Sequence, residues 1–420
     1  MSQAADIRVP SSKSETHRAL ILGALSAVPC TVHHPLLGQD CRSTLSILQA
    51  LGAQATLTES AVHFEPVERL QASENTLECG NSGTTLRLML AQVARLTGSC
   101  TLTGDASLQT RPNGPLLHAL SQLGATVTAH DDRAPITVSG PIRSGELQLP
   151  ARVSSQYASA LLLALSGLQG DSQLLLHAPV ASRPYLDITA TVARAFGLKW
   201  TAKNVESGLL YSIPGNQRPS ARKVEVAGDW SAAAFPLVAS ALLHRTVRLH
   251  GLREHSAQGD RRIVALMKRF GQGPSWQGDV LELKPGPLQG GGSIDLGDTP
   301  DLFPALAVLA ACANGTTRLF GAPSLRHKEC DRIDAMAQGL ACLGARFEEL
   351  PDGLLMYGGA PLGGGAVQSH QDHRVYMAFR VLGAHLRMRH GVEVTVSGAG
   401  CEGVSYPNFV ADLMRITHGE

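Results

Sequence analysis

The sequence predicts a repeated α/β fold of about six units, each about 70 residues long. The first observation behind this prediction is that five helix-like segments end in a bulky apolar residue followed by glycine. These glycines are 72, 73, 74 and 73 residues apart, in the pairs Leu51-Gly52, Leu123-Gly124, Phe196-Gly197, Phe270-Gly271 and Leu343-Gly344. Glycine readily adopts the left-handed conformation that closes a helix, so the recurrence indicates one supersecondary unit used repeatedly.

The second observation is a series of polar clusters in phase with the glycines. Each cluster precedes an apolar segment, as expected of a helix start. The six clusters lie at Ser11–Ser14, Asn81–Thr85, Ser154–Gln156, Asp229–Ser231, Asp298–Asp301 and Gln371–Arg374.

One unit illustrates the order of elements that we expect in the others. The cluster at Gly80–Thr85 opens an apolar helix over Leu86–Leu96, and a β-type stretch follows at Cys100–Thr103. A second helix is expected over Pro115–Leu123, and another strand over Ala125–Ala129. Such units bury their apolar faces against one another, and six are too many for one core. We therefore expect two groups of three units.

The composition excludes several classes of protein. With 44% hydrophobic and 17% charged residues, the chain has enough apolar material for large buried cores and does not resemble a disordered protein. A net charge of +1 and an aromatic content of 4% give no global case for binding nucleic acid or an anionic membrane. Any anionic partner must therefore be met by local clusters of Arg and Lys.

Cellular location is predicted from the cysteines and the apolar runs. The eight cysteines show neither a C-x-x-C motif nor metal-ligand spacing, which is typical of reduced cysteines in a cytosolic protein. The apolar run Ala19–Val28 could be taken for a signal peptide, but Asp6 and Glu15 precede it, so we assign it to the first helix. The run Leu302–Ala313 is too short to span a bilayer and contains Pro304. We expect a cytoplasmic protein.

Cations accompany several of the predicted helix starts. Ser, Thr and Asn at a helix start are first of all N-caps, but N-capping does not explain the Lys and Arg beside them. These are Lys13, Arg18, Arg87, Arg111, Lys328, Arg332 and Arg374. Helix N-termini attract anions, and added cations suit a ligand with phosphate and carboxylate groups. We therefore favour an anion-binding cleft.

Two segments offer carboxylates for acid/base chemistry. The segment Ser324–Asp334 is the densest in charge and could form a salt-bridged helix face. Alternatively, Glu329 is an acid/base group held beside substrate-binding cations. In the segment DLGDTPDLFP, an N-cap explains one of Asp298 and Asp301, and the other is available as a base.

Other features carry no functional prediction. His373 is expected to be structural and to orient a neighbour. No phosphate-binding loop of the G-x-x-x-x-G-K-[ST] type is present, and Gly290–Gly292 lacks the strand–loop–helix context of a dinucleotide site. We predict no cofactor and no metal.

Nine ordered motifs resemble the 5-enolpyruvylshikimate 3-phosphate synthase (3-phosphoshikimate 1-carboxyvinyltransferase) family. They are SKSETHRALILGALS, GNSGTTLRLM, GDASLQTRPNGPLLHAL, SSQYASALLLAL, GDWSAAAFPLVAS, DTPDLFPAL, LRHKECDRI, DHRVYMA and the YP of GVSYPNF. The resemblance implies a two-lobed inside-out α/β barrel of six βαβαββ repeats, three per lobe. It places one lobe at residues 13–227 and the other at 1–12 plus 228–420, with chain crossings near Ser12 and Gly228. The active site is expected in the cleft between the lobes, which is lined by helix N-termini.

The resemblance also implies the residues of the active site. Shikimate 3-phosphate would be bound by Lys13, Ser14, Arg18, Ser154, Ser155, Gln156, Ser182, Asp301 and Lys328, with Tyr185 nearby. Phosphoenolpyruvate would meet Lys13, Asn81, Gly83, Arg111, Gln156, Arg332 and Arg374. The implied reaction transfers the carboxyvinyl group of phosphoenolpyruvate to the 5-hydroxyl of shikimate 3-phosphate and releases phosphate, a step of chorismate and aromatic amino acid biosynthesis. Asp301 would be the base for the hydroxyl, and Glu329 and Lys13 would handle the C3 proton and the leaving phosphate. We expect a monomer that binds only these small anions.

Three positions depart from the family pattern. Val404 stands where the family has a lysine that reaches phosphoenolpyruvate, Asn113 where it has methionine, and Ser324 where it has Asn or Glu. Loss of the lysine motivates a second hypothesis, a paralogue that binds shikimate 3-phosphate or a similar ring but eliminates phosphate or water or uses another acceptor. A third hypothesis, a non-enzymatic scaffold, is disfavoured because Lys13, Asp301 and Glu329 are retained. Under the transferase hypothesis, we expect Val404→Lys to lower the KM for phosphoenolpyruvate.

Overall fold

The structure is a computed structural model that describes residues 4–150 and 154–419. The chain divides into two compact units. The inserted unit runs from Ser12 to Val226, and the terminal unit combines the described residues up to Ser11 with those from Ala227 onward. Each boundary lies one residue from the one that the sequence predicts.

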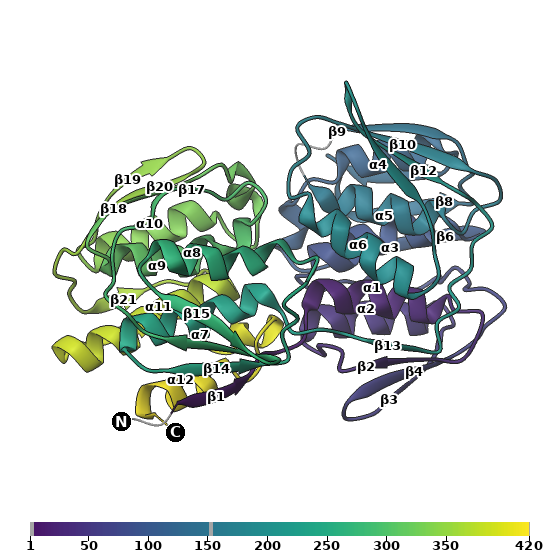
Figure 1. Cartoon of the computed structure of the whole chain (residues 1–420). Helices are drawn as coiled ribbons and strands as arrows, with labels where there is room; N and C mark the ends of the chain where they lie inside the picture. Colours follow the sequence, from purple (N-terminus) through teal and green to yellow (C-terminus); the bar gives the residue numbers. More distant parts are fainter. Residues whose placement is uncertain (1–3, 151–153, 420) are drawn as a thin grey trace. The chain divides into compact units, whose positions relative to one another are not determined.

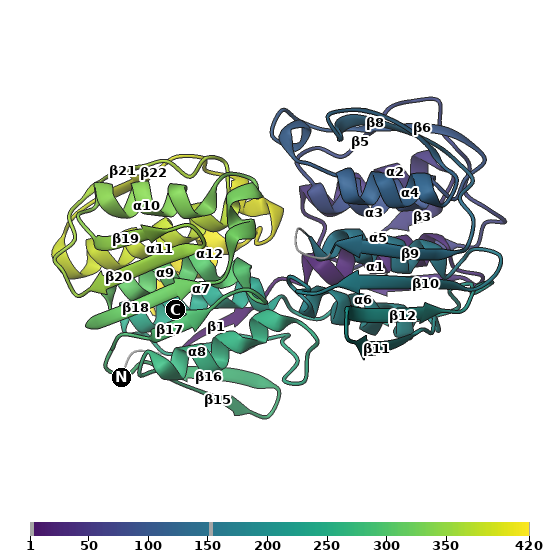
Figure 2. The same ribbon diagram turned by 90° about the horizontal axis from the view of Figure 1, so that it is seen from above.

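The inserted unit has three buried helices at its centre and three sheets around them (Figures 1 and 2). The central helices are α1 (Lys13–Ala24), α3 (Gly83–Val93) and α5 (Ser155–Leu165). The helices α2 (Gln39–Ala50), α4 (Gly114–Gln122) and α6 (Pro184–Ala195) are more exposed on one side. Most side chains of the central helices are apolar and buried, so the helices form the core that the sheets cover.

The three sheets of the inserted unit share one topology. In each, a parallel strand pair is extended by an antiparallel hairpin, in the orders β13-β2-β4-β3, β5-β6-β8-β7 and β9-β10-β12-β11. Their strands are β2 (Cys30–His33), β3 (Gln54–Leu57), β4 (Ala61–Glu65), β5 (Leu77–Glu78), β6 (Gly98–Thr103), β7 (Thr126–His130), β8 (Arg133–Gly140), β9 (Glu146–Pro150), β10 (Ser172–His177), β11 (Thr201–Val205), β12 (Gly208–Ile213) and β13 (Lys223–Glu225). One topology in three sheets indicates a repeat at the level of structure.

The terminal unit follows the same plan. Its central helices are α7 (Trp230–Leu243), α9 (Phe303–Cys312) and α11 (His373–His390), and its other helices are α8 (Ile263–Arg269), α10 (Arg332–Cys342) and α12 (Phe409–His418). The sheets have the orders β1-β14-β16-β15, β17-β18-β20-β19 and β21-β22. Their strands are β1 (Ala5–Arg8), β14 (Val247–His250), β15 (Gly273–Gln277), β16 (Val280–Lys284), β17 (Gly292–Asp295), β18 (Gly315–Phe320), β19 (Arg346–Leu350), β20 (Gly353–Gly358), β21 (Gly365–Val367) and β22 (Val394–Val396).

Two strands show how the chain passes from one unit to the other. Strand β1 precedes the inserted unit in the chain but pairs in parallel with β14, which follows it. Strand β13 ends the inserted unit and pairs in parallel with β2 near the beginning of that unit. The two crossing segments meet where the Asp229 amide donates to the Pro10 carbonyl at 2.8 Å. Each unit therefore completes its first sheet with a strand distant in sequence.

The glycine-closed helices are confirmed. The predicted apolar residue is the C-cap that directly follows each of helices α2, α4, α6, α8 and α10, and the glycine after it has a φ between +81° and +103°. All five apolar residues are buried, so each closing turn is held by the core as well as by its backbone conformation.

Five of the six polar clusters supply an N-cap. Ser12, Ser82, Ser154, Asp229 and Asp372 each accept a hydrogen bond from a backbone amide of the first helical turn. The prediction for the remaining cluster, Asp298–Asp301, is wrong, because neither Asp298 nor Asp301 caps α9. A 3₁₀ turn, η3 (Pro300–Leu302), leads into that helix instead, and Asp301 lies within the turn.

The sixth repeat departs from the βαβαββ pattern that the sequence predicts. After α11 and β22 come a 3₁₀ turn, η5 (Cys401–Val404), and α12, and the sheet has two strands where the others have four. Helix α12 buries Phe409, Leu413 and Ile416. These side chains join the core of the terminal unit, so an amphipathic helix covers apolar surface there without a hairpin.

None of the described helices is both long and apolar enough to span a bilayer. All eight cysteines are free thiols.

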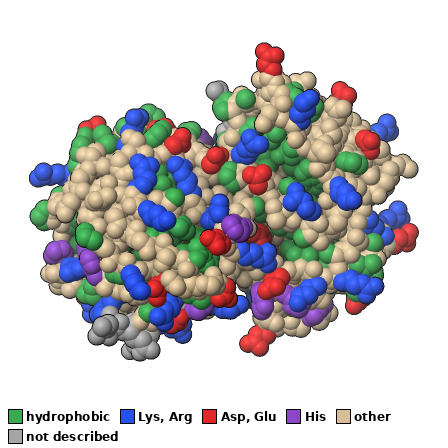
Figure 3. Space-filling model, viewed as in Figure 1, with side chains coloured by type: hydrophobic (Ala, Val, Ile, Leu, Met, Phe, Trp, Pro, Cys, Tyr) green, Lys and Arg blue, Asp and Glu red, His purple; other side chains and the backbone are tan. Residues whose placement is uncertain are grey.

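On the face drawn in Figure 3, Lys and Arg side chains are interspersed with Asp and Glu and form no continuous basic area. Concentrations of charge are found instead at the helix starts.

Candidate active site

The inserted unit carries a group of cations at its helix starts, which we call the basic cluster. It consists of Lys13 and Arg18 on α1, Arg87 on α3 and Arg111 before α4, together with the amides Asn81 and Gln156. The backbone amides in the first turns of α1, α3 and α5 have no intrahelical acceptor, and these turns carry partial positive charge. Cations and helix starts thus create a positive potential in the same part of the unit.

Arg111 and Asn81 form the best-defined contact of the basic cluster. The Arg111 guanidinium donates to the Asn81 side-chain oxygen at 2.6 Å, to the Asn81 carbonyl at 3.2 Å and to Ser107 Oγ at 3.1 Å. Gly83 begins α3 beside this guanidinium. A Cβ at this position would lie 3.3 Å from Nη1 of both Arg111 and Arg87, so glycine lets both cations approach the helix start.

Arg87 is a residue that the sequence-based site assignment missed. It donates to Gln156 Oε1 at 2.6 Å and to Asn113 Oδ1 at 3.2 Å, and its guanidinium lies 5.4 Å from the ring centroid of Tyr157. Gln156 in turn donates to Thr84 Oγ1 at 2.9 Å. The only sequence signal was its position one helical turn after Gly83. The contacts show that Arg87 joins the start of α3 to the start of α5.

Asn113 is one of the three departures from the family pattern, and the structure gives it a role. The residue is fully buried. Besides accepting from Arg87, it donates through Nδ2 to the Arg111 carbonyl at 3.0 Å. The methionine expected here could make neither hydrogen bond.

Lys13 joins the start of α1 to α2 and α3. Its ammonium lies 2.9 Å from Asp40 Oδ2, and the Asp40 carbonyl accepts from Thr85 Oγ1 at 3.0 Å. Behind it, the buried His17 contacts Thr44 Oγ1 at 2.8 Å. Desolvation and then the charges of Lys13 and Arg18 hold the pKa of His17 well below its ordinary value. His17 is therefore neutral in the folded protein.

Arg18 lies deeper than the other cations of the basic cluster. Only 1% of it is exposed, and it donates to Thr189 Oγ1 at 2.7 Å, to the Ser14 carbonyl at 2.7 Å and to Ser159 Oγ at 3.1 Å. A longer contact of 3.5 Å reaches the carbonyl of Tyr185, whose amide donates to the Ser182 carbonyl. Desolvation lowers the pKa of Arg18 to about 10, so it remains charged at neutral pH.

The remaining predicted residues of the inserted unit lie at element ends. Ser154 caps α5 and accepts from the Gln156 amide at 3.2 Å, and Ser155 is the buried first residue of that helix. Ser182 has a φ of +52° in the turn before α6. The described hydrogen bonds link Ser14, Ser182 and Tyr185 through Arg18. They link Asn81 and Gln156 through Arg111, Asn113 and Arg87.

The terminal unit carries a second group of charges, the mixed cluster. It consists of Asp301 in η3, Lys328 and Glu329 in the loop before α10, Arg332 at the start of α10, and Asp372 and Arg374 at the start of α11. Arg332 is at its centre with 1% exposure, and it contacts Asp372 at 2.7 Å, Asp301 at 2.8 Å and Glu329 at 2.6 Å. Asp301 also contacts Arg374 at 3.1 Å and Lys328 at 3.7 Å.

The salt-bridged helix face considered for Ser324–Asp334 does not form. Residues Pro323–His327 make a 3₁₀ turn, η4, and α10 begins only at Arg332, so Lys328 and Glu329 lie in the loop between them. Asp331 caps α10, which ends the loop and sets the position of Arg332. Ser324, the third departure, lies within η4.

The mixed cluster shifts the proton affinities of its cations in opposite directions. Desolvation disfavours the charged form of Arg332, but Asp372, Glu329 and Asp301 outweigh it and hold its pKa well above the ordinary value. Desolvation lowers the pKa of Lys328 against the attraction of Asp301, and the charge of Arg332 adds to the lowering. Lys328 is thus the cation of this cluster most easily deprotonated.

Asp260 is a second residue that sequence reasoning missed. It lies in the 3₁₀ turn η2 (Gly259–Arg262), is buried, and accepts a hydrogen bond from Ser231 Oγ. Desolvation and then the charge of Asp301 raise its pKa to about 7, against the opposing effects of Ser231 and Arg374. Because its segment carries no cluster of helix-starting residues, nothing in the sequence marks this carboxylate as buried.

Val404 and His373 also lie in the terminal unit. Val404 ends η5 and is half-buried, while His373 is the buried first residue of α11.

Among residues 4–150 and 154–419, no three His, Cys, Asp or Glu side chains are grouped so that they could hold a metal ion. The chemical groups that the two clusters offer are therefore cations, carboxylates, amides and helix starts.

Comparison with known proteins identifies the family of the chain. The family model described as EPSP synthase (3-phosphoshikimate 1-carboxyvinyltransferase) matches residues 2–413. Proteins named 3-phosphoshikimate 1-carboxyvinyltransferase are similar along nearly the whole chain. The one from Methanocorpusculum labreanum is 38% identical, covering 98% of this chain and 95% of its own. The one from Halobacterium salinarum is 39% identical, covering 96% and 94%.

A solved structure is also similar along nearly the whole chain. EPSP synthase from Acinetobacter baumannii superposes with a TM-score of 0.80 at 28% identity, covering 99% of this chain and 96% of that one. The two-lobed enolpyruvyl transferase fold that the motifs imply is thereby confirmed. The chain belongs to the EPSP synthase (3-phosphoshikimate 1-carboxyvinyltransferase) family.

Proposed function

We propose that this protein transfers the carboxyvinyl group of phosphoenolpyruvate to the 5-hydroxyl of shikimate 3-phosphate and releases phosphate. Family membership supports the reaction class. The observation that carries the proposal is the mixed cluster, in which Arg332 holds Asp301 and Glu329 within one network. A transferase of this kind needs both a proton acceptor and a proton donor beside cations that bind anionic substrates.

We propose that shikimate 3-phosphate is bound by residues of both units. Lys13, Arg18, Gln156 and the helix start at Ser154 and Ser155 suit its phosphate, because cations and helix N-termini bind phosphate together. Ser14 and Ser182 would add hydrogen bonds to the ring hydroxyls, and Asp301 and Lys328 would meet the hydroxyl that reacts.

Phosphoenolpyruvate would likewise engage both clusters. Asn81, Gly83, Arg111, Gln156 and Lys13 would contribute from the inserted unit, and Arg332 and Arg374 from the terminal unit. Planar guanidinium groups suit the carboxylate and phosphate of this substrate, which they can bind through two hydrogen bonds at once. Participation of both units would also exclude water from the reacting atoms.

The proposed reaction is an addition followed by an elimination. Asp301 accepts the proton of the 5-hydroxyl while its oxygen bonds to C2 of phosphoenolpyruvate, and C3 gains a proton from Glu329 or Lys13. C3 then loses a proton, the bond from C2 to the phosphate oxygen breaks, and inorganic phosphate leaves. Three cations contact Asp301. Substrate anions that draw Arg332 and Arg374 toward themselves would leave its oxygens accessible to the 5-hydroxyl proton.

An assay with both substrates tests the proposal. The protein is incubated with shikimate 3-phosphate with and without phosphoenolpyruvate, and phosphate release and products are followed by NMR. Phosphate released only when both are present supports the transferase. Product from shikimate 3-phosphate alone would instead identify a lyase, and binding without turnover would leave a scaffold.

Asp301→Asn tests the assigned base within the same assay. We expect kcat to fall by about 10²- to 10⁴-fold, the usual contribution of a general base. The matched control is Asp298→Asn, which changes an exposed carboxylate three residues earlier in the chain. Equal activity of the two variants would remove Asp301 from the mechanism.

We also propose that the protein acts as a monomer in the cytoplasm. Free cysteines suit a reducing compartment, and the charged clusters lie within single units. Sedimentation of the purified protein and fractionation of the source cells test the two statements separately.

A further inference from the structure

A cavity of about 850 Å³ lies in the inserted unit, away from the basic cluster. It is found at the C-terminal ends of the central helices, whose N-terminal ends carry the basic cluster. The residues that follow these helices line it: Ala24 and Leu25 after α1, Arg95–Thr97 after α3, and Gly167–Gln169 after α5. Helices of 11 or 12 residues are about 17 Å long, so the cavity and the cluster are at opposite ends of the unit.

Gln92 is a buried side chain of this cavity with an unused hydrogen-bond donor. It is 3% exposed, and its Oε1 accepts from Arg95 Nη1 at 2.9 Å. That contact fixes the orientation of the amide and leaves Nε2 as the donor. Within the described parts of the chain, Nε2 has no hydrogen-bond partner. A buried donor without an acceptor costs free energy, and an acceptor in the cavity would recover it.

Arg95 places a positive charge beside this donor. Its guanidinium donates to Gln92 and, at 3.5 Å, to the Gly167 carbonyl, both of which are neutral. A Cβ at Gly167 would lie 2.3 Å from Nη2, so this glycine makes room for the guanidinium. Desolvation lowers the pKa of Arg95 to about 10, which leaves it charged at neutral pH. A desolvated cation with neutral partners is stabilised by an anion.

The rest of the lining is both positive and apolar. Arg69 and Arg218 add two cations against the single carboxylate of Glu68. Leu25, Leu96 and Leu168 provide apolar wall. Pockets of this volume suit ligands of metabolite or drug size. We propose that this cavity binds a small organic carboxylate with an apolar body, whose carboxylate meets Gln92 and Arg95.

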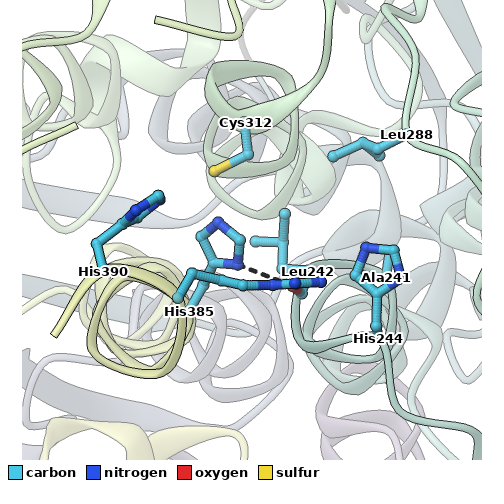
Figure 4. A pocket seen from close by; sticks show the side chains of 8 residues that line it. Ala241, Leu242, His244, Leu288, Cys312, His385 and His390 are labelled. Atoms are coloured by element: carbon cyan, nitrogen blue, oxygen red, sulfur yellow. Dashed lines mark hydrogen bonds between the residues drawn. The ribbon is translucent and has the colours of Figure 1, made fainter. Parts of the chain in front are cut away.

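The terminal unit has a related cavity that provides an internal comparison. It measures about 420 Å³ at the C-terminal ends of α7, α9 and α11, and His244, Cys312, His385, Arg389 and His390 are among its lining residues (Figure 4). His385 contacts the Leu242 carbonyl through Nδ1 at 2.8 Å. Desolvation lowers the pKa of both His244 and His385.

This second cavity lacks the features that indicate a carboxylate site. None of its described lining side chains is a buried polar group without a partner. Within the part of the chain that the structure describes, its lining includes one arginine, Arg389, and no lysine, aspartate or glutamate. Both units therefore have a space at the same end of their helices, but among the described lining residues only the cavity of the inserted unit pairs a half-buried, desolvated cation with a buried unused donor.

Titration with 4-phenylbutyrate and its uncharged analogue 4-phenylbutanamide tests the proposal. With the intact protein at slightly alkaline pH, we expect the carboxylate to bind about ten-fold or more tightly than the amide in calorimetry. Hydrogen exchange followed by mass spectrometry should slow in Val67–Ala72 and in Gln92–Thr97. Equal affinity for the two probes, no binding at millimolar concentration, or protection at the helix starts or around His385 would overturn the proposal.

Two matched variants locate the carboxylate. Gln92→Leu keeps a buried side chain of similar size and should weaken 4-phenylbutyrate binding about ten-fold while leaving the circular dichroism spectrum unchanged. Gln169→Leu makes the same exchange at an exposed position of the lining and should leave affinity unchanged. An unchanged affinity in Gln92→Leu, or an equal loss in Gln169→Leu, would contradict the assignment.

Discussion

The two charged clusters have similar numbers of cations but hold them in different ways. In the basic cluster, Arg18 and Arg111 hydrogen-bond hydroxyls, an amide and backbone carbonyls, all of which are neutral. In the mixed cluster, Arg332 contacts three carboxylates, and Arg374 and Lys328 contact one of them. Neutral partners orient a cation without cancelling its charge, whereas carboxylates cancel it.

The difference has a consequence for anionic ligands. An anion that approaches Arg18 and Arg111 meets positive charges that are hydrogen-bonded to neutral groups, whereas Lys13 of the same cluster is already paired with Asp40. One that approaches the mixed cluster competes with Asp301, Glu329 and Asp372 for the same guanidinium. We infer that the first cluster supplies affinity for anions, and that an anion bound at the second separates its carboxylates from the cations that hold them.

The largest effect is expected for Arg332→Ala. Removing this guanidinium leaves three carboxylates without their shared partner, two of them largely buried and one fully buried. Breaking a buried ion pair from one side costs about 3–5 kcal/mol. Urea unfolding should show a loss of this size in the terminal unit. Arg346→Ala, which removes an exposed arginine from the same unit, is the control, and similar losses in both variants would contradict the account.

Arg111→Ala should affect binding more than stability. Its neutral hydrogen bonds are worth about 1 kcal/mol each, so stability should fall by about 1–2 kcal/mol. Loss of a cation from an anion site costs about 2–5 kcal/mol, so kcat/KM for phosphoenolpyruvate should fall by about 30-fold or more. Steady-state kinetics measures this effect beside Arg143→Ala, an exposed control. A loss of stability that matched Arg332→Ala would show that the two clusters do not differ.

The two units should also respond to pH in opposite directions. The pKa of His17 is depressed, so the unfolded chain takes up a proton below about pH 6.5 that the folded inserted unit does not, and stability is lost as pH falls. The pKa of Asp260 is raised from 3.8 to about 7, so the folded terminal unit retains a proton that the unfolded chain releases, and stability falls as pH rises across that range. Each proton of difference changes stability by about 1.4 kcal/mol per pH unit.

Variants separate these two contributions. Relative to the original protein, His17→Gln should gain stability as pH falls below about 6.5, and Asp260→Asn should gain stability as pH rises toward about 7. Hydrogen exchange in α1 and in α7, measured over a pH series, reports on each unit separately. Parallel pH profiles for a variant and the original protein would exclude that residue as the cause.

The smallest effect is expected for Asn113→Met, which restores the residue usual in the family. The exchange removes the contacts to Arg87 and to the Arg111 carbonyl, so stability should fall by about 1–2 kcal/mol. Because Arg87 also holds Gln156, KM for phosphoenolpyruvate should rise by a few-fold while kcat changes less. Asn75→Met is an exposed control. An unchanged KM would show that Asn113 does not help to position Gln156.

Local features of the fold could be predicted from the sequence because they depend on neighbouring residues. A glycine after a helix acts through its own backbone angles, and an N-cap acts through amides two or three residues away. These effects explain why Leu51-Gly52 and its equivalents, and five of the six N-caps, were recognised. At Asp298–Asp301 the same reasoning failed, because Asp301 contacts cations from segments 27, 31 and 73 residues further along the chain.

The sequence by itself therefore determined the repeated helices, their ends and the family motifs, since short-range backbone and capping interactions specify them. Only the tertiary structure decided how the charges are paired. It surrounded Arg332 with three carboxylates, placed Arg87 between Gln156 and Asn113, and buried Asp260 next to Ser231. The physical reason is that pairing and desolvation depend on distance in space, which is set by packing of the helices and not by spacing along the chain.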